Sequence, residues 1–253
     1  MLWHVYVSIY HFVIMLLGFK QVANSWNVSV KSTFFEHGRS NLWKFLSVWV
    51  QVLTQLYYLT HAIIYVRKKN NTRKKSEELN LQLFLNNTYF SLIFPLTMLI
   101  CFGFWGLFII DRKIIYPEEM DDYFPFFYCH IYHTIPAVIV FIELLRGYLK
   151  TPTYSSTIRP LAIATTVYIS ILFKTYAEEK KWMYLVFYKL TLLQSIAGHV
   201  FFFSIVPMIL LQVGIYLNNW VITMRKLMEN NDEKTSNGKF LKRIPFLIFE
   251  IFK

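Results

Sequence analysis

Two side chains in this sequence are of the types that form a nucleophile and base pair, the hydroxyl of Ser47 and the imidazole of His133. In such a pair the imidazole takes the hydroxyl proton while the oxygen attacks a carbonyl carbon. Ser47 lies near the start of one long apolar stretch, and His133 lies near the start of another. Whether the two side chains can meet depends on the elements that carry them.

Ser47 opens a row of polar residues in an otherwise apolar segment. These residues recur at intervals of three and four, which places them on one face of a helix; this polar stripe consists of Ser47, Gln51, Thr54, Tyr58 and His61. Polar groups that face lipid are costly, so we expect the polar stripe to face other helices or a wet cavity. Such residues also hydrogen-bond between membrane helices without any chemistry, and the stripe alone favours that interpretation.

A second segment, FPFFYCHIYHTIPAVIVFIELL, carries His130 and His133 at i and i+3, which predicts a shared helical face. An imidazole inside a bilayer is uncommon and expensive to charge, so it is a candidate functional group; a structural histidine is the alternative. His130 and Thr134 are secondary candidates for orienting the base or the oxyanion. Gln51 is a third supporting candidate.

Other chemistries fit the sequence less well. Membrane di-iron enzymes need several histidine clusters, whereas most of the seven histidines here are scattered. A zinc ion on His130 and His133 would need a further ligand, and no carboxylate is placed near that face. Cys129 and Thr54 are the next candidate nucleophiles, although a free cysteine in a membrane helix is usually a packing residue. We therefore expect no cofactor and no metal.

Six apolar stretches must position these residues, and each is close to the about 20 residues that a helix needs to cross a hydrocarbon core. They cover residues 2–19, 45–66, 86–110, 126–145, 158–173 and 194–217. The expected fold is all-α, a polytopic membrane protein with a bundle of about six transmembrane helices. Residues 1–225 would form one transmembrane domain, and residues 226–253 a cytosolic polar and basic tail. The polar composition predicts disorder from residue 229 to residue 239.

The net charge of +11 marks topology rather than nucleic-acid binding, because no soluble domain remains to present the bases. The side that both termini share receives more of the 26 Lys and Arg residues than the other side, because it holds the cluster RKKNNTRKK, and this predicts cytosolic termini. Ser47 and His133 then both lie in the lumenal half, at depths that could match within a few ångström at 1.5 Å per residue. The endoplasmic reticulum and the plasma membrane both fit this topology.

Three motifs occur in order along the chain: WKFLS opens the second span, IDRKIIYP closes the third, and HIYHTIPAVIVFIEL forms the fourth. Together they resemble the androgen-induced protein family over roughly residues 1–220. The resemblance implies an integral membrane hydrolase that cleaves fatty acid esters of hydroxy fatty acids, with a threonine nucleophile and a histidine base. By motif these roles fall on Ser47, where serine replaces threonine, and on His133. Pro136 lies earlier in its span than the family pattern has it.

The predicted function is therefore that of a membrane lipid esterase acting on carboxylic ester bonds. Its substrate would be a lipid ester that enters a lumen-side cavity from the bilayer. Ser47 would attack the ester, His133 would act as base and then as acid, and water would hydrolyse the acyl-enzyme. The alternative is a non-catalytic binding or regulatory membrane protein whose polar residues only pack helices. The sequence does not indicate an oligomeric state.

Overall fold

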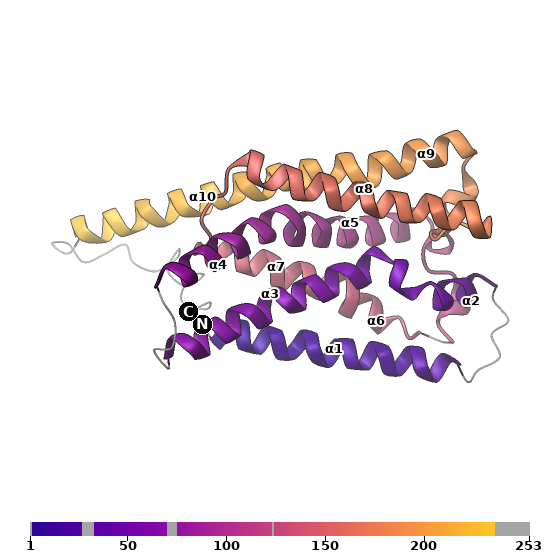
Figure 1. Cartoon of the computed structure of the whole chain (residues 1–253), viewed down its shortest axis with the longest axis horizontal. Coiled ribbons are helices and arrows are strands. Elements are labelled where there is room, and N and C mark those ends of the chain that lie inside the picture. Colours follow the sequence, from indigo (N-terminus) through magenta and orange to yellow (C-terminus); the bar gives the residue numbers. More distant parts are fainter. Residues whose placement is uncertain (1, 27–32, 70–74, 123, 236–253) are drawn as a thin grey trace.

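The computed structural model describes residues 2–26, 33–69, 75–122 and 124–235. All regular elements in these ranges are helical, and the long ones run side by side in one bundle (Figure 1). This arrangement confirms the expected all-α fold of a polytopic membrane protein. Residues 70–74 of the basic cluster RKKNNTRKK lie outside the described residues.

Six helical rods build the described bundle. Three are plain α-helices, namely α1 (Leu2–Trp26), α3 (Leu46–Lys69) and α8 (Tyr154–Glu179). The other three each contain a π-helical turn: α4 (Lys75–Thr88), η2 (Tyr89–Ile93) and α5 (Phe94–Ile110); α6 (Phe127–Cys129), η5 (His130–Thr134) and α7 (Ile135–Leu145); and α9 (Leu192–Val200), η7 (Phe201–Ile205) and α10 (Val206–Thr235).

The rods define two ends of the bundle. α1 begins and α10 ends at one of them, which we call the terminal end (Figure 1). The opposite end, which we call the loop end, holds the short elements: α2 (Thr33–Ser40), η1 (Leu42–Lys44), η3 (Arg112–Ile114), η4 (Glu118–Met120) and η6 (Leu185–Lys189). An even number of rods explains why the described chain begins and ends on the same side.

Five stretches within the rods are long and apolar enough to cross a membrane: Leu2–Gln21, Leu79–Ile110, Phe127–Leu145, Tyr154–Glu179 and Leu192–Met228. The remaining rod, α3, has 24 residues but is not among these stretches. Its polar stripe lowers its hydropathy, while Leu56, Leu59 and Ile63 on its outer side are exposed. The polar stripe faces the bundle, as predicted, because α1 packs along it.

Each π turn ends two residues before a proline, and the three prolines are Pro95, Pro136 and Pro207. A proline inside a helix lacks the N–H that would bond to the carbonyl four residues earlier, and its ring clashes with that carbonyl. In all three rods that carbonyl lies within the π turn, whose wider geometry relieves the clash. Pro136 thus explains why the turn that holds His133 is π-helical.

Two expected boundaries differ from the structure. The fifth apolar stretch, expected at residues 158–173, belongs to the longer helix α8. α10 continues to Thr235, so the expectation of disorder from residue 229 is wrong for residues 229–235. The polar composition of these residues did not reveal the extension, because they continue a helix that the preceding apolar segment has already formed. Residues 236–253 lie outside the described part of the chain.

Candidate active site

A cavity of about 510 Å³ lies at the loop end, between α1, α3, α5 and η7 and against the segment around η6. Ligand pockets commonly span about 300–1,000 Å³. The described lining is apolar apart from a few side chains and contains no Asp, Glu, Lys or Arg. Its polar and sulfhydryl groups belong to Gln21, Ser47, Gln51, Tyr116, Cys129, Tyr132, His133 and Tyr184. Such a lining suits an uncharged, largely hydrocarbon ligand.

Ser47 lies in the first turn of α3, and its side chain lines the cavity. The first N–H groups of a helix have no carbonyl partner within the helix. Here the N–H of Leu46 donates to the Tyr168 hydroxyl at 3.1 Å, and that hydroxyl is hydrogen-bonded to the Tyr184 hydroxyl at 2.5 Å. The two tyrosines therefore hold the start of α3 in place. The Ser47 hydroxyl itself forms no hydrogen bond with any described residue.

His133 lies in η5 and lines the same cavity. Its imidazole stacks on the ring of Phe104, with centroids 4.0 Å apart and ring planes at 10°. The buried Nδ1 has no hydrogen-bond partner among the described residues. His133 therefore lacks, within that part of the chain, the carboxylate that orients the histidine in a Ser-His-Asp triad.

The tertiary structure brings the two predicted residues to one cavity, from the adjacent elements α3 and η5. No hydrogen bond joins Ser47 to His133 in the described structure. Catalytic hydrogen bonds are often long in substrate-free enzymes and shorten when the substrate binds. The shared cavity supports the pairing of Ser47 with His133, and their catalytic roles stay predictions.

His130 and His133 have different surroundings, although a shared face was expected. A π turn holds more residues than an α turn, so side chains three positions apart diverge. His130 Nδ1 lies 3.2 Å from the Thr134 hydroxyl, which also accepts a hydrogen bond from the Trp105 indole at 2.9 Å. The ring of His130 packs on Trp105 at 4.8 Å. Neither His130 nor Thr134 lines the cavity, so the structure does not bring these two supporting candidates to it.

The remaining sequence candidates divide between the cavity and the helix interface. Gln51 lines the cavity, and its Nε2 lies 2.7 Å from Nδ1 of His11 on α1. Cys129 also lines the cavity, where it is 2% exposed. Thr54 is 1% exposed and does not line the cavity. Of the two reserve nucleophiles, only Cys129 is therefore placed to reach a ligand there.

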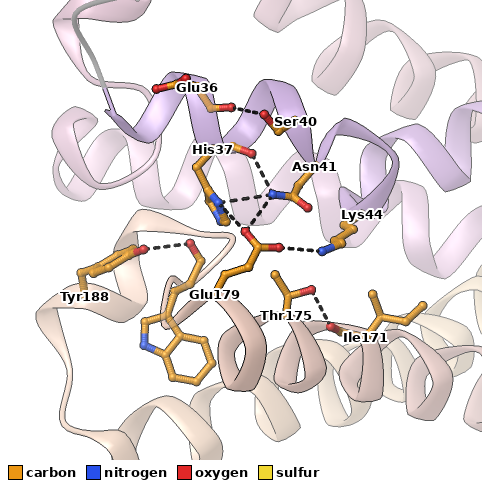
Figure 2. A network of polar contacts seen from close by, with 10 residues as sticks. Glu36, His37, Ser40, Asn41, Lys44, Ile171, Thr175, Glu179 and Tyr188 are labelled. Atoms are coloured by element: carbon orange, nitrogen blue, oxygen red, sulfur yellow. Dashed lines mark hydrogen bonds and ion pairs between the residues drawn. The ribbon is translucent and has the colours of Figure 1, made fainter.

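A carboxylate that the sequence did not single out, Glu179 at the end of α8, binds the segment that precedes Ser47 in the chain. Glu179 lies 3.0 Å from His37 Nδ1, and it accepts hydrogen bonds from Asn41 Nδ2 at 3.2 Å and Lys44 Nζ at 3.0 Å (Figure 2). Burial lowers the pKa of His37 below its usual 6.5, so a neutral ring can donate its Nδ1–H to the carboxylate. Sequence reasoning missed Glu179 because 135 positions separate it from Lys44.

The connection between α5 and α6 covers another part of the cavity, which Tyr116 lines. Arg112 forms an ion pair with Asp121 and donates from Nε to the Tyr116 carbonyl at 3.2 Å. Asp111 follows the last residue of α5 and accepts from the Lys113 N–H at 3.0 Å. Burial raises the pKa of Tyr116, so its hydroxyl stays protonated. These contacts make the connection a folded wall of the cavity.

A second polar cluster, also missed, lies at the terminal end. Glu143 is buried and accepts hydrogen bonds from Trp3 Nε1 at 2.7 Å and Arg146 Nη1 at 3.1 Å; its other oxygen lies 3.0 Å from His4 Nε2. The ring of His4 stacks on that of His61, with centroids 4.5 Å apart. A glutamate inside an apolar stretch was the available signal, because carboxylates in spans need partners.

The fold and the cavity define a polytopic helical membrane protein with an internal apolar site that carries a serine and a histidine. The chain belongs to the FAR-17a/AIG1-like protein family, whose model matches residues 4–219. This result confirms the resemblance drawn from the three sequence motifs.

Two human relatives illustrate the similarity. The chain is 27% identical over 219 residues to human Androgen-dependent TFPI-regulating protein, a match that covers 84% of this chain and 91% of that protein. It is 23% identical over 202 residues to human Androgen-induced gene 1 protein, a match that covers 76% of this chain and 82% of that protein. The corresponding hamster protein, from Mesocricetus auratus, is 28% identical over 205 residues. No solved structure matches the chain.

Proposed function

We propose that this protein is an integral membrane lipid esterase that hydrolyses fatty acid esters of hydroxy fatty acids. The observation that carries the proposal is that Ser47 and His133, from separate rods, line one apolar cavity. Contact with such a lining lowers the free energy of hydrocarbon chains relative to water. The polar ester group would instead contact the few polar side chains. In the proposed topology the cavity opens toward the lumen or cell exterior and both termini are cytosolic.

The reaction would proceed in two steps. The Ser47 oxygen attacks the ester carbonyl while His133 takes its proton, and His133 then gives that proton to the departing hydroxy fatty acid oxygen. Water next attacks the acyl group on Ser47, with His133 again taking a proton. The Ser47 oxygen leaves and regains a proton, which releases the fatty acid. No cofactor takes part in this sequence.

A different class of function is favoured by one observation. Three residues of the polar stripe contact histidines of α1: Gln51 contacts His11, Tyr58 contacts His4 and His11, and His61 contacts His4. Those contacts fit helix packing alone. A non-catalytic regulatory membrane protein is therefore the competing proposal, and it differs in leaving Ser47 unreactive.

A serine-directed fluorophosphonate probe separates the two proposals. The intact protein in membranes would be exposed to the probe, and hydrolysis of a fatty acid ester of a hydroxy fatty acid would be measured in parallel. We expect labelling and hydrolysis by the wild type and their loss in Ser47→Ala. Ser91→Ala is the matched control, because Ser91 is 1% exposed within a rod and does not line the cavity. Equal labelling of Ser47→Ala and wild type would overturn the proposal.

A further inference from the structure

A row of polar side chains leads from the terminal end to the cavity along the interface of α1 and α3. We call it the polar column; it consists of Glu143, His4, His61, Tyr58, His11 and Gln51. Glu143 contacts His4 at 3.0 Å, and the ring of His4 lies 4.5 Å from that of His61 and 5.9 Å from that of Tyr58. The series of contacts is therefore unbroken through the first half of the bundle.

The second half of the polar column reaches the cavity. The ring of Tyr58 stacks on that of His11 at 5.8 Å, and His11 Nδ1 lies 2.7 Å from Gln51 Nε2. Gln51 lines the cavity, as does Ser47 one turn earlier on α3. The polar column thus ends beside the proposed nucleophile.

Unpaired polar atoms are concentrated along this interface. Seven buried atoms of α1 and α3 have no hydrogen-bond partner among the described residues: Tyr10 Oη, His11 Nε2, Thr54 Oγ1, Gln55 Oε1, Tyr57 Oη, Tyr58 Oη and His61 Nε2. Folded proteins pair nearly all buried polar groups with other groups or with ordered water. Six other unpaired atoms are spread over the rest of the described bundle, so such atoms are densest on these two neighbouring helices. We take solvent as the partner that the surrounding side chains do not supply there.

The proposed hydrolysis requires a water molecule beside Ser47, but the cavity offers few polar groups to hold one. The lining is apolar, and a lipid ester that fills it would displace water from the cavity. The polar column has an outer end of its own, because the His4 side chain is 14% exposed at the terminal end. Water could therefore enter there while hydrocarbon chains occupy the cavity.

We propose that the polar column is hydrated and supplies the water that hydrolyses the acyl-enzyme. The inference rests on the proposed function for its role in turnover, but not for its hydration. The water oxygen bonds to the acyl carbon and gives a proton to His133, the bond between that carbon and the Ser47 oxygen breaks, and this oxygen takes the proton back. A fatty acid and the free Ser47 hydroxyl result.

Hydration is tested by cysteine accessibility in a full-length background with Cys101→Ala and Cys129→Ala. Thr54→Cys should react with a small water-soluble methanethiosulfonate reagent, because Thr54 lies along the polar column with its hydroxyl unpaired. Ile64→Cys is the control: Ile64 lies on the same helix nearer the terminal end, but within the apolar core. Reaction of Thr54→Cys no faster than that of Ile64→Cys would overturn the proposal.

The role in turnover is tested with His11→Phe, which fills the polar column with an apolar ring. We expect an unchanged rate of fluorophosphonate labelling and a retained first burst of hydroxy fatty acid. Steady-state release of fatty acid should fall several-fold, and mass spectrometry should find acyl-enzyme accumulating. Phe12→Leu, an exposed position on α1, is the control. Unchanged steady-state hydrolysis by His11→Phe would contradict the water-supply role, whereas failure of the wild type to label at all would instead contradict the proposed function.

Discussion

The imidazole of His133 lies flat against the ring of Phe104, with centroids 4.0 Å apart and ring planes at 10°. In Ser-His-Asp hydrolases a carboxylate fixes the orientation of the base. No described residue bonds to Nδ1 of His133, so the aromatic stack and the helix geometry take over that orienting role. The proposed base is thus positioned mainly by packing.

Replacing Phe104 by leucine should lower turnover while leaving the protein folded. Leucine keeps much of the apolar volume but removes the flat surface, and small misplacements of catalytic groups can cost about 100-fold in rate. We expect a loss of about 10- to 100-fold in kcat for ester hydrolysis. Phe102→Leu, on the lipid-facing side of the same helix, should have little effect. Equal activities of the two variants would show that the stack does not orient the base.

Ser47→Thr should remain active, whereas Ser47→Ala and Ser47→Val should not. Threonine keeps an attacking hydroxyl, while valine has nearly the same shape as threonine and no oxygen. Loss of a catalytic hydroxyl lowers turnover by several orders of magnitude. If Ser47 only packed helices, Ser47→Ala would cost about 0.6 kcal/mol and leave hydrolysis intact. Comparing the three variants in one assay therefore separates shape from chemistry.

His133→Ala should abolish hydrolysis, and His130→Ala should mainly reduce stability. His133 lines the cavity, whereas His130 packs on Trp105 and contacts Thr134. We expect His130→Ala to cost about 1 kcal/mol through its hydrogen bond and packing, seen as a lower Tm in detergent. Full activity in His133→Ala combined with loss in His130→Ala would show that the base has been assigned to the wrong residue.

Glu179→Gln should weaken the attachment of the segment that leads into Ser47. The Glu179 carboxylate lies 3.0 Å from Lys44 Nζ and 3.0 Å from His37 Nδ1 (Figure 2). A glutamine amide is uncharged and has only one oxygen, so it cannot replace both contacts. We expect a loss of about 1–2 kcal/mol and a raised KM, because Gly38 and Leu42 of the same segment line the cavity. Glu178→Gln provides the matched control, since Glu178 is exposed and lies 3.8 Å from Lys174. Identical Tm and KM values for both variants would rule out this role.

Pro136→Ala should stabilise the protein and lower its kcat for ester hydrolysis. Alanine restores the N–H that proline lacks, and without the ring an α turn is no longer barred by the clash that costs about 3 kcal/mol in an ordinary helix. The turn could then tighten from π to α geometry, which would rotate His133 away from the cavity. Pro95→Ala is the control. Pro95 follows a π turn that does not line the cavity, so this substitution should raise Tm without loss of activity. An unchanged kcat in Pro136→Ala would mean that the π turn is not needed for catalysis.

The sequence by itself determined the all-α, multi-span character of the chain and which face of α3 turns inward. Both results follow from local physical chemistry, since hydrocarbon excludes charged segments and polar groups at helical spacing must avoid lipid. Residue types and motif order also singled out Ser47 and His133. Composition could not determine that α3 and η5 are neighbours, because contact between separate rods depends on the packing of the whole bundle.

Only the tertiary structure decided what surrounds each candidate. Phe104 became the support of His133, and Glu179 the anchor of Lys44, through contacts between residues far apart in the chain. His130 and His133 have different surroundings because spacing rules assume α geometry, whereas Pro136, two residues after the end of η5, widens the turn that carries them. Side-chain surroundings are set by many weak contacts from distant segments at once, and no short stretch of sequence records their sum.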